Sequence, residues 1–315
     1  MKQKLLLSTV VTLSILVLTC TAFARGEKEG EAELSGSVKI AGSSTVYPVS
    51  VAIAEEFNKM YPNVEIPVQS TGTGGGFKNF FISGKTDIND ASRGIKDSEL
   101  DNARANGIEP LEFQVAVDAI TIVVNPEADW VDSMTVEQLA HIWRPDNPAQ
   151  KWSDVDSSWP DEKIELYGPT SASGTFDFFT EKIIGEEGAS RSDYQGTEQD
   201  NTIVQAVSGS KYAMGYFGMA YYLENKDKVK AIKLDGVKPS IETAKSGKYS
   251  PLSRPLFIYV SNESLKRPEV EQYVHYYLQQ TSTDLIKEIG YVPMTEAEMK
   301  RNLARFEDIV AELKK

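Results

Sequence analysis

The chain has 315 residues, of which 41% are hydrophobic and 25% charged, and its formal net charge is −13. This length and apolar content suffice for one large domain or two domains of ordinary size. Nucleic acids and anionic membrane surfaces are polyanions, so a chain this acidic is poorly suited to bind either.

Residues 1–24 have the pattern of a secretory signal peptide. Lys2 and Lys4 precede an apolar run over 5–19, and Ala22-Phe23-Ala24 has the small residues of a cleavage site. The run is shorter than the roughly twenty residues that span a bilayer. The sequence therefore predicts export to the periplasm or the outer face of the cell membrane.

The only cysteine, Cys20, lies at the end of the apolar run. Cleavage after Ala24 would remove it and leave a mature net charge of −15, because two lysines and no acids are lost. Lipidation of Cys20 is the alternative, and it would anchor the protein to a membrane. Residues 25–35 are predicted to form a flexible leader, since "RGEKEGEAE" is charged and lacks large apolar side chains.

From residue 36 the chain alternates strand-like and helix-like segments. The predicted strands are 37–42, 64–70, 86–92, 113–126, 163–169, 213–218 and 253–260. The predicted helices are 47–62, 75–84, 133–143, 175–185, 201–209, 267–280, 281–290 and 295–315. The order strand–helix–strand–helix–strand at the start predicts a parallel sheet with helices on both faces.

Two long apolar strands, near 111–125 and 251–260, bracket the middle of the chain. The simplest layout is two α/β lobes joined by two crossings, with a cleft that suits a small ligand. We expect residues 36–117 with 254–315 to form lobe I, and residues 118–253 to form lobe II. Trp143, Trp152 and Tyr216 are expected in the core.

Three loops share one design: "AGSSTVYP" at 41–48, "STGTGGGFK" at 70–78 and "GPTSASGTF" at 168–176. Each is expected just before a helix, where the first backbone N–H groups lack partners. Glycine admits a close approach, and Ser and Thr hydroxyls add donors. Three such loops that converge would hold a tetrahedral oxyanion. Each loop alone also has the ordinary interpretation of an N-cap and a turn.

These loops, together with "TDINDASRGIKDSE", "DNTIVQAVSG" and "PLSRPLFIYV", resemble the periplasmic phosphate-binding proteins of Pst-type ABC transporters. The resemblance runs from about residue 36 to the C-terminus. It implies an α/β, two-lobe periplasmic-binding-protein fold of type II. It also implies inorganic phosphate as ligand and the membrane permease subunits of an ABC transporter as partners. We expect a monomer with no cofactor, no metal site and no catalytic residue.

The resemblance carries specific residues to the ligand. They are hydroxyl and glycine residues of the three loops: Ser44 and Thr45 in the first, Thr73 and Gly74 in the second, and Ser173, Gly174 and Thr175 in the third.

Three positions depart from the pattern of many family members. Arg93 stands where some members have an aspartate, although others share the arginine. Pro169 and Ala172 stand where many have polar or charged residues, including an arginine that contacts phosphate. Arg93 is therefore predicted to supply the cation of the site.

The proton of dibasic phosphate needs an acceptor, which sulfate does not, because unpaired buried polar groups cost free energy. With Arg93 in the usual aspartate position, Asp177 is the first choice as acceptor, followed by Asp90 and Asp200. A favourable charge at a helix N-terminus is the alternative role of Asp177.

The sequence leaves two possible roles open for each of two further residues, Arg254 and Asn201. Arg254 either reaches the ligand or ties the crossing strands with a salt bridge, and we favour the second. Asn201 either caps its helix or contacts the ligand.

The main alternative function is enzymatic, as a secreted phosphoester hydrolase. The chain has only His141 and His275, both expected in structural or surface roles, and it lacks a G-x-S-x-G elbow and metal-ligand spacing. Other oxyanions of the sulfate or molybdate type, and a sensor or adhesin that keeps the fold, also stay open.

Overall fold

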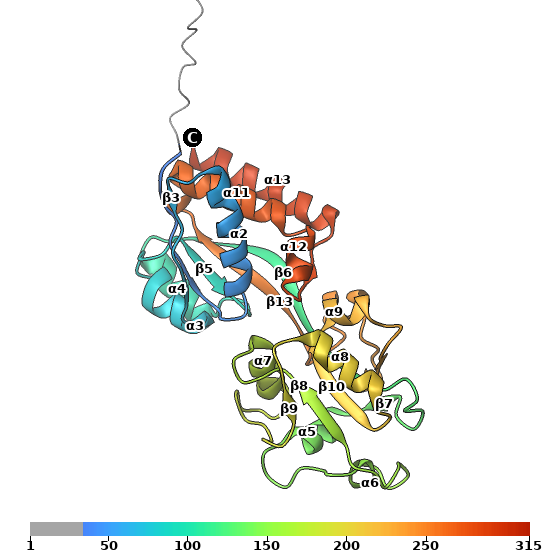
Figure 1. Cartoon of the computed structure of the whole chain (residues 1–315). Coiled ribbons are helices and arrows are strands. Elements are labelled where there is room, and N and C mark those ends of the chain that lie inside the picture. Colours follow the sequence, from blue (N-terminus) through green and yellow to red (C-terminus); the bar gives the residue numbers. More distant parts are fainter. Residues whose placement is uncertain (1–33) are drawn as a thin grey trace, which may run out of the picture. The chain divides into compact units, whose positions relative to one another are not determined.

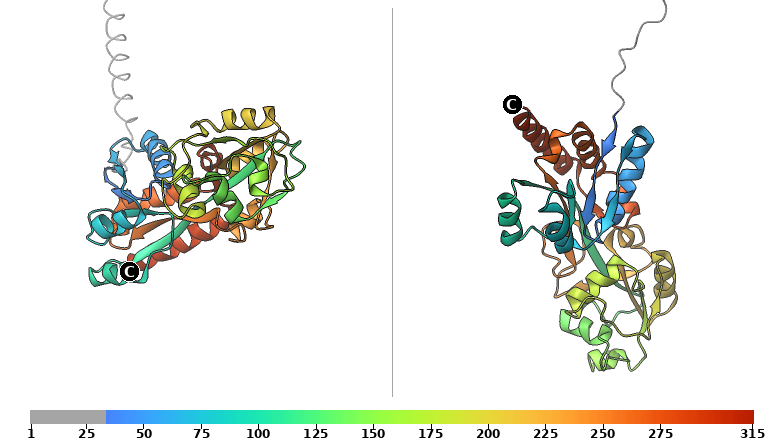
Figure 2. Two further views of the ribbon diagram at one scale, coloured as in Figure 1. Left: turned by 90° about the horizontal axis from the view of Figure 1, so that it is seen from below. Right: turned by 90° about the vertical axis from the view of Figure 1, so that its left-hand side faces the viewer.

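The computed structural model describes residues 34–315 (Figures 1 and 2). The predicted signal peptide, its cleavage site, Cys20 and nearly all of the predicted leader lie outside these residues. Within the described range, no helix has the length and apolar content needed to cross a bilayer.

Residues 35–315 form one unit, organised around a ten-stranded sheet. Its strand order is β4-β2-β5-β13-β6-β10-β8-β9, and β11 and β14 pair with β6. The bounds are β2 Ile40–Gly42, β4 Val68–Ser70, β5 Ile88–Ala91, β6 Pro110–Val124, β8 Glu165–Gly168, β9 Gln195–Gly196, β10 Ala213–Gly218, β11 Lys230–Ala231, β13 Ser253–Ser261 and β14 Val292–Pro293. Two small sheets pair β1 (Gly36–Ser37) with β3 (Val64–Glu65) and β7 (Ser133–Met134) with β12 (Lys233–Leu234).

The two long strands β6 and β13 connect the halves of the sheet. Most of β6 pairs antiparallel with β13, whose other neighbour is β5. The last five residues of β6, 120–124, pair instead with β10. Both strands pass from the elements around β5 to those around β10 in Figure 1. We call the elements around β2, β4 and β5 the first lobe, and those around β8 and β10 the second lobe.

Helices surround both parts of the sheet. The first lobe holds α2 Tyr47–Met60, α3 Thr73–Gly76, the π-helix η1 Phe77–Phe81, α4 Asp97–Ala105, the 3₁₀ helix η2 Ser264–Lys266, α11 Pro268–Gln280, α12 Asp284–Glu288 and α13 Glu296–Leu313. The second lobe holds α5 Val136–Trp143, α6 Trp152–Val155, α7 Gly174–Ile183, α8 Asp200–Gly209, α9 Met219–Glu224 and α10 Ile241–Lys245. The chain thus returns to the first lobe for its C-terminal helices.

Part of the predicted sheet is wrong. The segment 64–70 is not one strand but β3 and β4, which belong to different sheets. Pro67 separates them, because proline has no N–H for a strand ladder. The parallel pairing predicted for the first strands is confirmed, because β2 runs parallel to both β4 and β5, and β13 is then antiparallel to both β5 and β6.

An aromatic cluster fixes α7 on the second lobe. The rings of Phe179 and Tyr216 stack at 3.9 Å, and Trp143 meets Tyr216 edge-on at 4.9 Å. Trp143, Trp152 and Tyr216 are all buried, which confirms them as core residues. A Cβ on Gly168, where β8 ends, would lie 2.8 Å from Cε1 of Tyr216. The loop that enters α7 therefore begins at a position that only glycine fits.

Candidate functional site

Each of the three predicted loops joins a strand to a helix. The loop at 41–48 leads from β2 to α2, the loop at 70–78 from β4 into α3 and η1, and the loop at 168–176 from β8 to α7. Because β2 and β4 are parallel neighbours, the first two loops leave the same edge of the sheet.

Glycines bring the first two loops together at the end of β5. Gly42 has a φ of +144°, and a Cβ there would lie 2.1 Å from the carbonyl oxygen of Asp90. A Cβ on Gly76 would lie 2.2 Å from Oδ1 of Asn89 and 2.7 Å from Cα of Gly42. Both positions exclude a side chain, so the sequence requires glycine where the backbones touch.

A cavity of about 580 Å³ opens where these loops meet the beginning of α7. The ligand-binding residues predicted from the sequence that line it are Ser44, Thr45, Thr73, Arg93 and Asp177. Gly74 lies beside Arg93, because a Cβ on it would be 3.3 Å from the Arg93 Nη2. Gly174 faces the first loop, since its Cβ would be 3.9 Å from the Thr45 Cα. Residues from both lobes therefore meet at this cavity.

Ser173 and Thr175 do not belong to the lining that the described residues form. Ser173 is the N-cap of α7, and its Oγ accepts a hydrogen bond from the backbone N–H of Thr175 at 3.2 Å. In this structure the two residues, which flank Gly174, therefore form the ordinary N-terminal cap of α7.

The lining also contains residues that sequence reasoning missed: Ser43, Gly72, Ser92, Gly94, Phe178, Glu181, Lys182, Glu187 and Pro255. Local signals existed for some of them. Ser92 and Gly94 flank Arg93, and Glu181 lies one helical turn after Asp177 on α7. Ser92 also binds the second loop, because its backbone N–H donates to Oγ1 of Thr73 at 3.1 Å.

Arg93 is held by an acid of its own lobe. Its Nη1 and Nη2 donate to the two carboxylate oxygens of Glu99 at 2.9 and 2.8 Å. Burial acts to raise the pKa of Glu99, but hydrogen bonds from Arg93 and from the backbone of Lys96 outweigh it, and the pKa is lowered. The Arg93 charge is thus already paired when it reaches the cavity, and its side chain is 34% exposed.

Arg254 also lines the cavity, and it contacts both lobes. Its Nε donates to Oδ2 of Asp118 at 3.1 Å, and its Nη2 donates to Oγ1 of Thr45 at 2.8 Å. Its guanidinium also lies over the ring of Phe178 on α7, 3.7 Å from the centroid. The predicted salt bridge between the crossing strands is present. The residue lines the cavity as well.

Of the three carboxylates considered as proton acceptors, Asp177 lines the cavity. Burial and then the charge of Glu187 raise the pKa of Asp177, while Arg254 acts in the opposite direction. Asp90 is buried behind the first loop, where Ser50 Oγ donates to its Oδ1 at 2.9 Å, and burial raises its pKa to about 8. Burial, followed by the charge of Glu198, raises the pKa of Asp200 to about 6, but Asp200 lies outside the cavity lining.

Asn201 also lies outside the lining. It is exposed in the first turn of α8.

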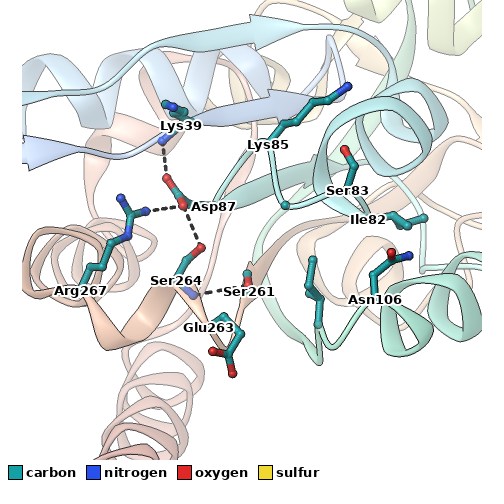
Figure 3. A pocket seen from close by; sticks show the side chains of 12 residues that line it. Lys39, Ile82, Ser83, Lys85, Asp87, Asn106, Ser261, Glu263, Ser264 and Arg267 are labelled. Atoms are coloured by element: carbon teal, nitrogen blue, oxygen red, sulfur yellow. Dashed lines mark hydrogen bonds and ion pairs between the residues drawn. The ribbon is translucent and has the colours of Figure 1, made fainter.

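A second cavity, of about 460 Å³, lies in the first lobe (Figure 3). It sits at the starts of β2 and β5, the strand ends opposite to the loops, near Lys39 and Asp87. Asp87 accepts hydrogen bonds from the Lys39 backbone N–H at 2.8 Å, from Ser264 Oγ at 2.7 Å and from Arg267. These bonds tie η2 and α11 to the sheet. The acid at the centre of this cavity therefore has a structural role, and we do not assign the ligand to it.

The first cavity combines hydroxyls, loop backbone and arginine with acids: Arg93, Arg254 and Lys182 against Asp177, Glu181 and Glu187. Across residues 34–315, no group of three or more His, Cys, Asp or Glu side chains is placed to hold a metal ion. Two lobes joined by two long strands, with such a cavity between them, define a protein that captures a small polar solute.

Comparisons with known proteins specify the family. Residues 27–281 match the model of the PBP superfamily domain. The chain is 42% identical over 294 residues to the protein SphX of Synechocystis, covering 91% of this chain and 85% of that protein. It is 36% identical over 314 residues to the phosphate-binding protein PstS of Staphylococcus epidermidis, covering 98% and 94%. The crystal structure of a possible phosphate-binding protein from Planctomyces limnophilus superimposes with a TM-score of 0.82 at 44% identity, covering 88% and 99%.

The chain therefore belongs to the PBP superfamily and, within it, to the family of PstS phosphate-binding proteins. The predicted α/β, two-lobe periplasmic-binding-protein fold and the predicted family are confirmed. The exact boundaries of the two lobes stay a prediction.

Proposed function

We propose that this protein binds inorganic phosphate in the interlobe cavity and delivers it to the membrane permease of an ABC transporter. The observation that carries the proposal is the convergence of the loops at 41–48 and 70–78 with the start of α7 on one cavity that also holds two arginines. Helix N-termini, hydroxyls and guanidinium groups are donors, and an oxyanion accepts from all of them. The names of the relatives in Staphylococcus and Planctomyces point to the same ligand.

The proposed ligand-binding residues are those predicted from the sequence: Ser44, Thr45, Thr73, Gly74, Arg93, Ser173, Gly174, Thr175 and Asp177. Ser173 and Thr175 would reach the ligand through the N-terminal turn of α7, because Gly174 between them already faces Thr45. Asp177 is proposed as the acceptor for the proton of phosphate, since it lines the cavity from α7.

We further propose that the mature protein is exported, acts as a monomer and has no catalytic activity. The predicted signal peptide at residues 1–24 supports export, and Cys20 is the proposed site if the chain carries a lipid anchor. His141 lies on α5 and His275 on α11, and neither lines the cavity. A carrier rather than a hydrolase fits this placement of the two histidines.

Equilibrium dialysis with labelled phosphate, competed by sulfate, arsenate and molybdate, tests the ligand. We expect saturable binding of one phosphate per chain, displaced by arsenate and much less by sulfate. Sulfate or molybdate that displaces phosphate at equal concentration would replace the proposed ligand with another oxyanion. Incubation with a phosphoester tests the carrier role in parallel, since steady release of product would show an enzyme.

A further inference from the structure

The two arginines of the cavity differ in how many donors they keep free. A guanidinium group has five N–H donors. Arg93 makes three hydrogen bonds, two to Glu99 and one to the carbonyl of Gly94. Arg254 makes two, to Asp118 and to Thr45. Its Nη1 lies 3.9 Å from Oε2 of Glu181, beyond hydrogen-bond distance. Within the part of the chain that the structure describes, Arg254 thus keeps three N–H donors without a partner.

These free donors belong to a side chain that is only slightly exposed and is held in place from two sides. The Arg254 side chain is 14% exposed, whereas that of Arg93 is 34% exposed. Asp118 holds its Nε from one side, and the ring of Phe178 supports the flat face of the guanidinium from the other. Donors that are held in place before a ligand arrives need little reorganisation to bind it.

The bond to Thr45 adds a second donor at the same point. Thr45 Oγ1 accepts from Arg254 Nη2, so the hydroxyl hydrogen of Thr45 stays available for another acceptor. Thr45 comes from the first lobe and Phe178 from the second, while Arg254 itself lies on the crossing strand β13. A ligand oxygen placed here would therefore contact groups of both lobes through one side chain and its neighbour.

We propose that Arg254, and not Arg93, is the principal cation of the ligand site, and that Asp118 is the positioning residue that aims it. This inference rests on the proposed binding of an oxyanion. The remaining N–H groups of Nη1 and Nη2 donate to ligand oxygens, while Nε stays on Asp118. Arg93, neutralised by Glu99, contributes at the rim of the cavity.

The test compares Arg254→Gln with the matched variant Arg93→Gln by titration calorimetry with phosphate. Losing charge-assisted hydrogen bonds from Arg254 is expected to raise Kd about a hundredfold or more. Arg93→Gln is expected to raise Kd less than about tenfold, because its charge is already paired. Arg254→Gln binding within about threefold of the parent protein, or a larger loss in Arg93→Gln, would overturn the assignment.

Arg254→Gln also leaves Asp118 without its cation, so loss of binding could reflect a damaged fold. The double variant Asp118→Asn with Arg254→Gln removes both charges and keeps a polar amide side chain at each position. Its near-UV circular dichroism is expected to match that of the parent protein, while its phosphate Kd stays raised about a hundredfold. If the double variant binds as tightly as the parent, Arg254 has only a structural role.

Two controls separate the inference from the function on which it rests. A parent protein that binds no phosphate contradicts the proposed function itself. A parent protein that binds phosphate, with an unaffected double variant, contradicts only the role of Arg254. Arg254→Lys is a further control. The lysine ammonium restores the positive charge but not the planar set of guanidinium donors, so we expect its phosphate affinity to lie between those of Arg254→Gln and the parent protein.

Discussion

The Nε atom of Arg254 donates to Oδ2 of Asp118 at 3.1 Å, and the two residues are direct register partners on β13 and β6. The pair therefore sits on the two strands that connect the lobes. Both side chains are largely withdrawn from water, at 14% and 3% exposed. Burial raises the pKa of Asp118, and the Arg254 charge counteracts this shift.

Breaking this pair should cost stability, because it leaves a buried guanidinium without its anion. We expect Asp118→Ala to lower the free energy of unfolding by about 3 kcal/mol in urea titrations. The matched control is Asp132→Ala, which breaks the exposed 2.8 Å pair with Lys233 and should change stability little. Equal losses in the free energy of unfolding would show that burial of the Asp118–Arg254 pair adds nothing to stability.

Neighbouring glycines of the second loop test whether the close contact between the first two loops is needed, because Gly76 makes that contact and Gly75 does not. A Cβ on Gly76 would overlap Asn89 and Gly42, whereas the nearest atom to a Cβ on Gly75 is 3.8 Å away, on the Thr71 side chain. We expect Gly76→Ala to lower the free energy of unfolding by about 1–3 kcal/mol and to weaken phosphate binding. Gly75→Ala should be close to neutral in both urea unfolding and calorimetry. A neutral Gly76→Ala would mean that the loops separate without loss of function.

Asp177 should decide between phosphate and sulfate. Asp177→Ala removes the proposed acceptor for the phosphate proton, so phosphate affinity is expected to fall about tenfold or more, while sulfate binding holds or improves. Because burial raises the pKa of Asp177, its carboxylate takes up a proton earlier on acidification, and selectivity should fall as pH is lowered. Competition calorimetry at several pH values measures the ratio.

The control for this experiment is Asp200→Ala, since Asp200 lies outside the cavity lining. Its phosphate-to-sulfate ratio should equal that of the parent protein. An unchanged ratio in Asp177→Ala, or a changed one in Asp200→Ala, would move the acceptor elsewhere.

The sequence predicted the loops because their chemistry is local. Hydroxyls and glycines before an apolar helical repeat mark a strand-to-helix junction wherever they occur, and the resemblance then placed Ser44, Thr45 and Thr73 on one ligand. The same local rules predicted the strand at 113–126, most of which lies in β6, and the helix at 295–315, which begins with a capping box in which Thr295 Oγ1 accepts from the Glu298 N–H at 3.2 Å.

What the sequence could not show depends on register and on long-range contacts. Nothing near Arg254 indicates that Asp118, 136 positions earlier, is its partner in the sheet. Glu187 lines the cavity because of the path that the loop after α7 takes. No periodic pattern in the sequence predicts the path of a loop. Pro67, which splits this segment, is visible in the sequence, but the prediction of one strand over 64–70 did not take its missing N–H into account.

The buried carboxyl of Asp90 should give the stability of the protein a distinct pH dependence. Its pKa rises from an ordinary value of 3.8 to about 8, because burial penalises the charged form more than the Ser50 hydrogen bond favours it. Its titratable neighbours are Tyr273 and Tyr277 of α11, whose pKa values are raised mainly by burial and then by Asp90. They are neutral near pH 7 and do not compensate the Asp90 charge.

The sign follows from proton binding. Between about pH 4 and about pH 8, the folded state keeps a proton that the unfolded state has lost, so the free energy of unfolding falls with rising pH by up to about 1.4 kcal/mol per unit. Above that window both states are ionised and the difference is constant. Asp90→Asn cannot ionise, so it should match the parent protein near pH 4 and exceed its stability by up to about 4 kcal/mol near pH 7.

Urea unfolding of both proteins across this window isolates the contribution of Asp90, because all other carboxylates are shared and cancel in the difference. Two curves that stay parallel from about pH 4 to about pH 8 would show that Asp90 is ionised in the folded protein. In that case, water or a rearranged Ser50 must solvate its second oxygen, which has no hydrogen-bond partner in the described structure.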